Sequence, residues 1–368
     1  MVDLSAWEPL EDAAAVLSGG TFGAVAHLGV LEKAHPGLHT QIMKIVVAGG
    51  SGQVGTVLAR AFLARGDEVV TLTRGSGAAV GRAVTWDGAS LGEWAREVDG
   101  ADVVVNLAGR SVDCRYNAAN RREIVDSRVH STRVIGEAIG QAARPPAVWL
   151  QAGTATIYAH TYDRPNDEDS GVIGGGEPGV PDTWRFSIDV AKAWEQALDD
   201  APVTATKKVM LRSAMTMSPD RGGVFDVLLG LVRRGLGGRA GDGRQYISWI
   251  HHHDFVRAMF WLVERDDVEG AVNLAAPEPL PNADFMRALR RAWGARFGLP
   301  ATGWMLEAGA FVMRTETELV AKSRRVVPGR LLEDGFEFHH PSWPEAADDL
   351  CSEWRTRQGT PRRRSRTP

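Results

Sequence analysis

The most constraining feature of this sequence is a short apolar run followed at once by regularly spaced glycines. Residues 44–48 (KIVVA) are typical of a buried strand, and Gly49, Gly52 and Gly55 then recur at every third position. From Val54 onward, apolar residues recur with the period of a helix. Strand, glycine turn and helix place bare backbone N–H groups where they can bind a pyrophosphate. A flexible glycine loop is the alternative. The sequence predicts a dinucleotide site formed by Gly49, Ser51, Gly52, Gln53, Val54 and Gly55.

The end of the next predicted strand, residues 68–73, indicates which dinucleotide is bound. NAD-specific sites usually place an acidic residue here, about 20 residues beyond the glycines, to bind the ribose 2′-hydroxyl. This chain has Thr73 and Arg74 instead. A guanidinium pairs well with a 2′-phosphate and has no reason to prefer a bare hydroxyl. We therefore expect NADP(H) to be preferred over NAD(H), and a solvated surface arginine is the alternative.

A second strand-to-glycine segment follows at residues 102–109. Its apolar run is suited to a strand buried on both faces of a parallel sheet. Further strands are expected at 83–86, 147–152 and 208–212, with helices between them. The end of the 102–109 segment should approach the adenine side of the cofactor, through Asn106, Leu107, Ala108 and Gly109.

Bulk composition excludes several classes of partner. The net charge of −4 and the isoelectric point of about 6.2 argue against a nucleic-acid partner. No apolar run approaches the roughly 20 residues of a membrane helix. The only two cysteines, Cys114 and Cys351, are far apart, which favours reduced thiols and a cytoplasmic location.

Several motifs occur in one order that resembles the extended short-chain dehydrogenase/reductase superfamily. They are the Gly49–Gly55 turn, NLAG at 106–109, DSRV at 126–129, the Thr154–Tyr158 turn and SWIH at 248–251. More narrowly, the chain resembles the NAD-dependent epimerase/dehydratase-like family that ends in a DUF1731 domain, over roughly residues 43–354. RVVP at 325–328 and GFEF at 335–338 look like the signature of that C-terminal domain.

The resemblance implies a domain organisation. The fold class is α/β: a Rossmann-type doubly wound parallel sheet at 43–220, completed by 252–275, with a smaller C-terminal α+β substrate lobe at 221–355. Residues 1–42 precede Met43 without sustained periodicity, and we expect a poorly ordered extension there, with a packed regulatory arm as the alternative. Residues 356–368, which include RRRSR, are expected to be a disordered basic tail.

The resemblance also implies chemistry that this chain lacks in part. The superfamily uses Tyr-x-x-x-Lys on one helix, where the tyrosine exchanges a proton and the lysine lowers its pKa. None of the four tyrosines is followed by lysine four positions on. Alignment on Trp194 places Ser187 and Ala191 at the two positions. Lys192 is one residue away, rotated by about 100° on a helix, so it cannot replace the lysine.

Other residues remain candidates for the site. Thr154, at the superfamily's Ser/Thr position, and the phenol of Tyr158 are expected to be catalytic, with a turn-capping hydroxyl and a packing ring as the alternatives. Arg128 is a candidate contact for the substrate or the cofactor, unless it makes a surface ion pair. Arg244 and Gln245, in the expected substrate lobe, are candidates for an anionic or polar group of the substrate.

Two further features have structural interpretations. His251, His252 and His253 suggest a metal, but neighbours in a strand point to opposite faces, so no metal site is predicted. Asp254 would instead cap the following helix. An apolar stripe of Trp304, Met305 and Phe311 indicates core or a homodimer interface.

The functional hypothesis is an NADP(H)-dependent oxidoreductase or epimerase-like enzyme that acts on a small polar substrate. The sugar-nucleotide and carbonyl classes both remain open. The missing Tyr-x-x-x-Lys pair favours the alternative, a non-catalytic NADP(H)-binding protein that senses redox state or acts as a scaffold.

Overall fold

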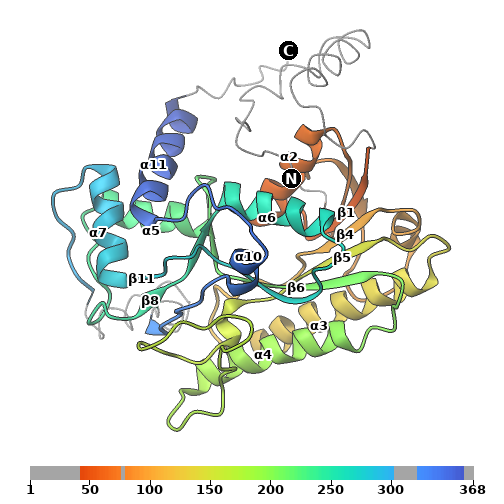
Figure 1. Ribbon diagram of the computed structural model, residues 1–368, viewed down its shortest axis with the longest axis horizontal. Helices are drawn as coiled ribbons and strands as arrows, with labels where there is room; N and C mark the ends of the chain where they lie inside the picture. The colour runs from red at the N-terminus through yellow and green to blue at the C-terminus, as the bar shows by residue number, and fades with distance from the viewer. Residues whose placement is uncertain (1–41, 76–78, 302–320, 360–368) are drawn as a thin grey trace.

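The computed structural model describes residues 42–75, 79–301 and 321–359 (Figure 1). The extension predicted at 1–42, the end of the basic tail and the Trp304 stripe therefore lie largely outside the described residues. Among the described residues, no helix combines the length and the apolarity that crossing a bilayer would require.

A seven-stranded sheet, parallel throughout, forms the centre of the molecule. Its spatial order is β10-β6-β5-β4-β1-β2-β3. The strands are β1 (Lys44–Ala48), β2 (Glu68–Thr73), β3 (Arg82–Thr85), β4 (Val103–Asn106), β5 (Val148–Ala152), β6 (Lys207–Ser213) and β10 (Gly270–Leu274). The order runs outward in both directions from β1, so the predicted Rossmann-type fold is confirmed.

Helices cover both faces of the sheet, because alternate residues of each strand point to opposite sides. Ile45 and Val47 of β1 pack with α2 (Gln53–Arg65) and α6 (His252–Glu264). Val46 and Ala48 pack on the other side with α3 (Ala118–Gln141), the end of α4 (Asp182–Asp199) and Trp94 of the 3-10 helix η2 (Glu93–Glu97). In Figure 1 the first pair of helices lies above the sheet and the second pair below it.

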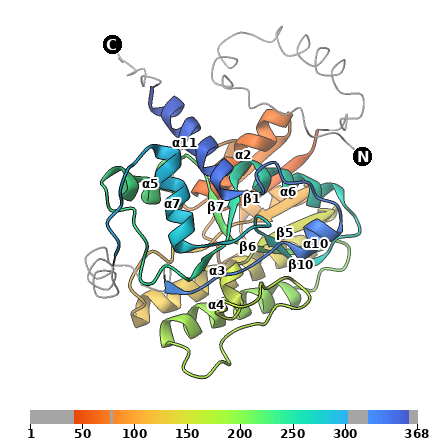
Figure 2. The same ribbon diagram turned by 60° about the vertical axis from the view of Figure 1, so that its left-hand side comes forward.

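A smaller lobe is built from the segments beyond β6. Its strands form two short pairs, β7 (Met215–Met217) with β9 (Trp249–His251) and β8 (Tyr246–Ile247) with β11 (Leu280–Pro281). Its helices are α5 (Val224–Arg233), α7 (Asn282–Trp293) and α11 (Trp343–Gly359), which lie together beside the sheet (Figure 2). Trp343 is fully buried at their centre, stacked on Phe285 with ring centroids 3.9 Å apart.

Two contacts hold distant segments of the chain against the edge strand β10. The short helix α10 (Gly329–Glu333) packs near β10, and Arg330 Nη1 donates to the carbonyl of Ala271 over 2.9 Å. Glu168 accepts a hydrogen bond from the backbone N–H of Asn273 over 2.7 Å. Segments distant in the sequence therefore meet at the β10 edge of the sheet.

Candidate active site

The three glycines of the turn between β1 and α2 have different surroundings: two are packed tightly against backbone atoms, and one borders open space. Gly49 has φ of 75°, and a Cβ there would meet the backbone carbon of Leu107 at 2.8 Å. A Cβ on Gly55 would meet the Cα of Gly50 at 2.6 Å. At Gly52, in contrast, a Cβ would meet no atom closer than 3.4 Å. Packing therefore requires glycine at 49 and 55, whereas the bare backbone of Gly52 faces free space.

That free space is a cavity of about 660 Å³ at the carboxyl ends of β1, β2 and β4, hereafter the β2-side cavity. The predicted cofactor residues that line it are Gly49, Ser51, Gly52, Thr73, Arg74, Leu107, Ala108 and Gly109. The hydroxyl of Thr73 donates to that of Ser51 over 3.4 Å and joins the first two strand ends. The structure thus brings most of the predicted dinucleotide residues together.

Arg74 reaches the β2-side cavity from the end of β2 and is exposed to solvent. Asp87 lies at the same edge, beyond β3, and its carboxylate accepts hydrogen bonds from Ser90 and from the backbone N–H of Ala89. Hydrogen bonds from Ser90 lower the pKa of Asp87 to about 2. Arg74 is therefore a solvated cation at the cavity wall, whereas the Asp87 carboxylate already accepts hydrogen bonds from the turn that follows it.

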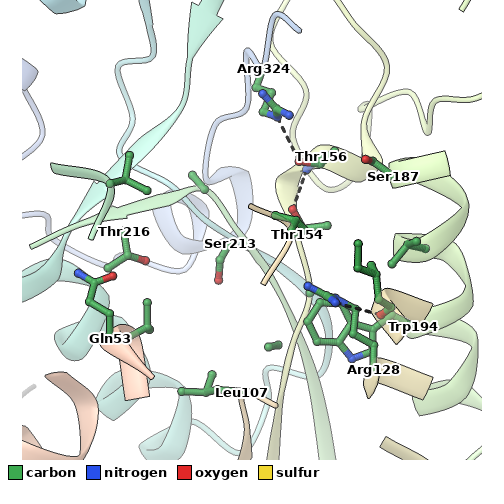
Figure 3. Close-up of a pocket in the computed structure, with 18 of the residues that line it drawn as sticks. Gln53, Leu107, Arg128, Thr154, Thr156, Ser187, Trp194, Ser213, Thr216 and Arg324 are labelled. Carbon is green, nitrogen blue, oxygen red and sulfur yellow. Dashed lines mark hydrogen bonds between the residues drawn. The ribbon is translucent and has the colours of Figure 1, made fainter. Parts of the chain in front are cut away.

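A second cavity, of about 350 Å³, adjoins the first because Leu107 lines both, and we call it the β5-side cavity. Among the predicted residues it is lined by Gln53, Val54, Leu107, Arg128 and Thr154. Figure 3 shows Arg128 against Trp194 on one side, with Gln53 and Thr216 opposite. The Nε2 atom of Gln53 is buried and makes no hydrogen bond within the described part of the chain, so this amide can bind a ligand.

Arg128 is a cation in a largely apolar wall. Its Nη1 donates to the carbonyls of Arg110 and Ile124, each over 3.0 Å, and its guanidinium lies 4.9 Å from the ring of Trp194. Desolvation lowers the pKa of Arg128 to about 10, so the side chain remains charged at neutral pH. No carboxylate among the described residues pairs with it. The expected surface ion pair is therefore not what this arginine makes.

Thr154 lies at the end of β5 and serves two purposes. Its Oγ1 accepts a hydrogen bond from the backbone N–H of Thr156 over 3.1 Å, as the capping alternative supposed. It also lines the β5-side cavity. Within the described residues the Thr154 hydroxyl proton has no acceptor of its own, so it can be donated to a ligand.

The helix that carries the Tyr-x-x-x-Lys pair in the superfamily is α4. Ser187 lines the β5-side cavity at the tyrosine position. Ala191 is buried at the lysine position. Lys192 donates to the carbonyl of Gly174 over 2.8 Å and does not line the cavity. The expectation that Lys192 points elsewhere therefore agrees with its position.

The structure places Tyr158 outside the lining of both cavities, so its position does not support the expected catalytic role. The residue is 2% exposed, and its phenol donates to Asn273 Oδ1 and accepts from Arg212 Nη1, each over 2.9 Å. Arg212 in turn makes a two-pronged ion pair with Glu195. Burial raises the pKa of Tyr158. The phenol is held inside the protein, and the packing-ring alternative describes it better.

Four other predicted residues also lie outside both cavities. Asn106 is fully buried, and its Oδ1 accepts the backbone N–H of Ala108 over 3.0 Å, so it shapes the turn rather than lining it. Gly55 packs on Gly50. Gln245 is buried and donates to the carbonyl of Ala240 over 3.0 Å. Arg244 lies over the ring of Tyr162, 5.4 Å from its centroid. These positions do not support direct roles in ligand binding.

The structure corrects the assumption that the three adjacent histidines lie in one strand. They do not share a strand, because β9 ends at His251 and α6 begins at His252. Their rings consequently converge, with centroids 4.1–4.8 Å apart. The N-cap of α6 is His251, whose Nδ1 accepts from the backbone N–H of His253. Asp254 is not the cap, since it accepts from the N–H groups of His339 and His340.

Sequence reasoning missed several cavity residues. Trp86 lines the β2-side cavity because it follows β3, and the shared edge of parallel strands could have identified it. Ser213 lines the β5-side cavity at the end of β6 for the same reason. Arg324 comes from the C-terminal region, 168 positions from Thr156, to whose Oγ1 it donates over 3.1 Å. No local sequence pattern predicts a contact between residues so far apart in the chain.

Comparison with known proteins decides the family. Residues 45–275 match the NAD dependent epimerase/dehydratase family, and residues 301–350 match a domain of unknown function, DUF1731. The chain belongs to the NAD dependent epimerase/dehydratase family. This confirms the resemblance found in the sequence, including the C-terminal domain.

Individual relatives agree with this assignment. The human epimerase family protein SDR39U1 is 30% identical over 313 residues, which cover 84% of this chain and 100% of the relative. A crystal structure of human SDR39U1 (isoform 2) with NADPH superimposes with a TM-score of 0.74 at 29% identity, covering 84% of this chain and 99% of that one. A nucleoside-diphosphate sugar epimerase from Corynebacterium glutamicum has a TM-score of 0.67 at 24% identity, covering 89% of this chain and 62% of that one, and shares the fold.

Proposed function

We propose that this member of the epimerase family binds NADP(H) along the carboxyl edge of its sheet and acts as an oxidoreductase or epimerase-like enzyme on a small polar substrate. The observation that carries the proposal is the pair of adjoining cavities that meet at Leu107. The β2-side cavity holds the glycine turn and Arg74, and the β5-side cavity holds polar groups suited to a substrate. Their arrangement fits an extended dinucleotide whose redox-active end lies beside the substrate.

The cofactor preference rests on charge at the end of β2. Arg74 is a cation on the wall of the β2-side cavity, and no acidic residue occupies the strand end where one would bind a 2′-hydroxyl. The open position at Gly52 and the first turn of α2 suit the pyrophosphate. The crystal structure of human SDR39U1 with NADPH supports the same choice.

The substrate class follows from Arg128 and Thr154. The Arg128 guanidinium would bind a carboxylate or a phosphate, because anions pair strongly with a partly desolvated arginine. The hydroxyl of Thr154 would donate to a carbonyl or hydroxyl oxygen of the same molecule. Bound NADP(H) would supply or accept the hydride. A substrate with an anionic group and a carbonyl or hydroxyl carbon thus fits the β5-side cavity.

The second candidate function is binding without turnover. Ser187 and Ala191 stand where the superfamily has its tyrosine and lysine, and the Tyr158 phenol is held inside the protein. These observations favour a protein that uses NADP(H) to sense redox state or to act as a scaffold. A screen of carbonyl and sugar-nucleotide substrates that follows NADPH absorbance separates the two. Tight NADPH binding with no turnover on any of them would refute the enzyme proposal.

The cofactor proposal is tested by Arg74→Ala. Loss of a hydrogen bond to a charged group costs about 1.5–3 kcal/mol, which corresponds to about 10–150-fold in affinity. We expect NADPH to be weakened by that factor and NADH hardly at all, measured by fluorescence titration. Arg96→Ala is the matched control, because Arg96 is exposed and pairs with Glu93 on η2. Equal losses for both cofactors would contradict the role of Arg74.

A pair of glycine variants tests where the pyrophosphate lies. Gly52→Ala should fold normally but bind NADPH poorly, because its Cβ would meet no protein atom closer than 3.4 Å and would extend toward the cofactor. Gly55→Ala should lose folding stability, because its Cβ would lie 2.6 Å from the Cα of Gly50. Thermal unfolding and NADPH titration of both variants measure the two effects. Unchanged NADPH affinity in a folded Gly52→Ala variant would refute the placement.

A further inference from the structure

The convergence of histidines at the start of α6 forms a polar cluster that lies apart from both cavities. His252 and His253 occupy the first two positions of α6, and Glu353 lies on α11. His252 Nε2 is 3.1 Å from Glu353 Oε1, and His253 Nε2 is 3.7 Å from the same oxygen. None of these three residues lines either cavity. The cluster is therefore independent of the proposed cofactor and substrate sites.

We propose that His252, His253 and Glu353 bind one zinc-like divalent transition-metal ion, which links α6 to α11. In a tetrahedral zinc site, ligand bonds of about 2.0–2.1 Å place neighbouring ligand atoms about 3.3–3.4 Å apart. The observed separations of 3.1 and 3.7 Å lie within a few tenths of an ångström of that value. Two imidazoles and one carboxylate suit zinc, and a water molecule would complete the tetrahedron.

A second carboxylate lies near the cluster. Asp349 lies one helical turn before Glu353 on α11, and its Oδ2 is 3.2 Å from Nε2 of the buried His251. One ligand atom from Asp349 also lies within 4.8 Å of ligand atoms from His253 and His340. A cation bound by His253 would therefore lie near the carboxylate of Asp349 as well as that of Glu353.

His251 supports the cluster without being a ligand. Its Nδ1 accepts from the backbone N–H of His253, so the neutral ring carries its proton on Nε2 and has no lone pair there for a metal. Its ring is fully buried and stacks on His340, with centroids 3.8 Å apart. His251 thus fixes the start of α6 and the orientation of the next two imidazoles.

Glu353 presents one of its two carboxylate oxygens to the histidines. Arg357 donates to Glu353 Oε2 over 2.9 Å, which leaves Oε1 facing the histidines. Because a helix N-terminus disfavours cations, the two carboxylates of α11 are needed to balance the ion at the start of α6.

Equilibrium dialysis of the untagged full-length protein against Zn²⁺, followed by elemental analysis, tests the proposal. We expect one bound zinc per chain and a higher melting temperature with zinc than with a chelator. His253→Gln and Glu353→Gln should each lower zinc affinity by at least about 10–100-fold, the loss typical of weaker, outer-shell partners. His339→Gln is the control, because His339 is exposed and outside the cluster. Substoichiometric zinc, or unchanged affinity in the two ligand variants, would overturn the proposal.

Cobalt binding to the wild-type protein gives a readout that needs no folded variant. Co²⁺ held by two imidazoles, a carboxylate and water should show the intense visible absorption of a four-coordinate complex. Displacement by one equivalent of Zn²⁺ should abolish that absorption. The weak spectrum of the six-coordinate aqueous ion, unchanged by the protein, would overturn the proposal even if His253→Gln and Glu353→Gln failed to fold.

Discussion

The position of Tyr158 makes a prediction that separates a structural role from a catalytic one. In Tyr158→Phe the ring keeps its packing, but Asn273 Oδ1 and Arg212 Nη1 lose the phenol that lies 2.9 Å from each. A buried polar group left without its partner costs about 1–3 kcal/mol. Arg212 keeps its two-pronged pair with Glu195, and Asn273 Nδ2 keeps its bond to the carbonyl of Val327. We therefore expect a total loss of about 1–3 kcal/mol in the free energy of unfolding.

Urea unfolding followed by circular dichroism measures this loss, and NADPH titration on the same samples measures binding. We expect NADPH affinity to be unchanged, because Tyr158 lines neither cavity. Tyr162→Phe is the matched control, because the Tyr162 hydroxyl makes no hydrogen bond within the described part of the chain, and a change within about 0.5 kcal/mol is expected. A Tyr158→Phe variant with normal stability and abolished turnover would refute the structural role and restore the catalytic one.

Three further predictions concern the cavity, a surface turn and the C-terminal segment. Arg128→Met should weaken a carboxylate-bearing substrate or inhibitor by about 10–100-fold while leaving NADPH binding intact, and calorimetry would contradict the assignment if anion affinity stayed the same. The pKa of Asp87 in the folded protein, about 2, lies below its ordinary value of 3.8, so its contribution to stability is present above pH 3.8 and lost as the pH falls toward 2. Asp87→Asn should flatten that acid dependence in denaturation midpoints measured across this range, and an unchanged slope would count against the hydrogen bonds from Ser90. Ser248→Ala removes a hydroxyl that accepts from the backbone N–H of Val326 over 2.8 Å, and should lower the free energy of unfolding by about 1–3 kcal/mol, whereas a loss below about 0.5 kcal/mol would show that the contact is dispensable.

The sheet and its glycine turn could be predicted because their determinants are local. An apolar run, three glycines and a helical period lie within about twenty neighbouring residues, and each has one common structural interpretation. The position of Arg74 at the wall of the β2-side cavity could be predicted because Arg74 directly follows β2, and the carboxyl ends of parallel strands meet at one edge of the sheet.

Side-chain roles that depend on distant partners could not be predicted in this way. Tyr158 follows the right turn, but its phenol is held by Arg212, 54 positions away, and by Asn273, 115 positions away. The prediction that the three adjacent histidines share a strand was wrong because the boundary between a strand and a helix falls within the run: β9 ends at His251 and α6 begins at His252. Such boundaries are the least reliable part of any sequence-based assignment.

The position of β10 has a consequence for how the molecule can be divided. The chain leaves the sheet after β6, builds part of the smaller lobe, and returns through α6 to add β10 beside β6. A fragment that ends before α6 would therefore lack one covering helix and an outer strand, and would leave β6 as an open edge prone to association. The NADP(H)-binding half proposed for this protein is consequently not a detachable module. Gene fusions or truncations that keep it must also keep the sequence through Leu274.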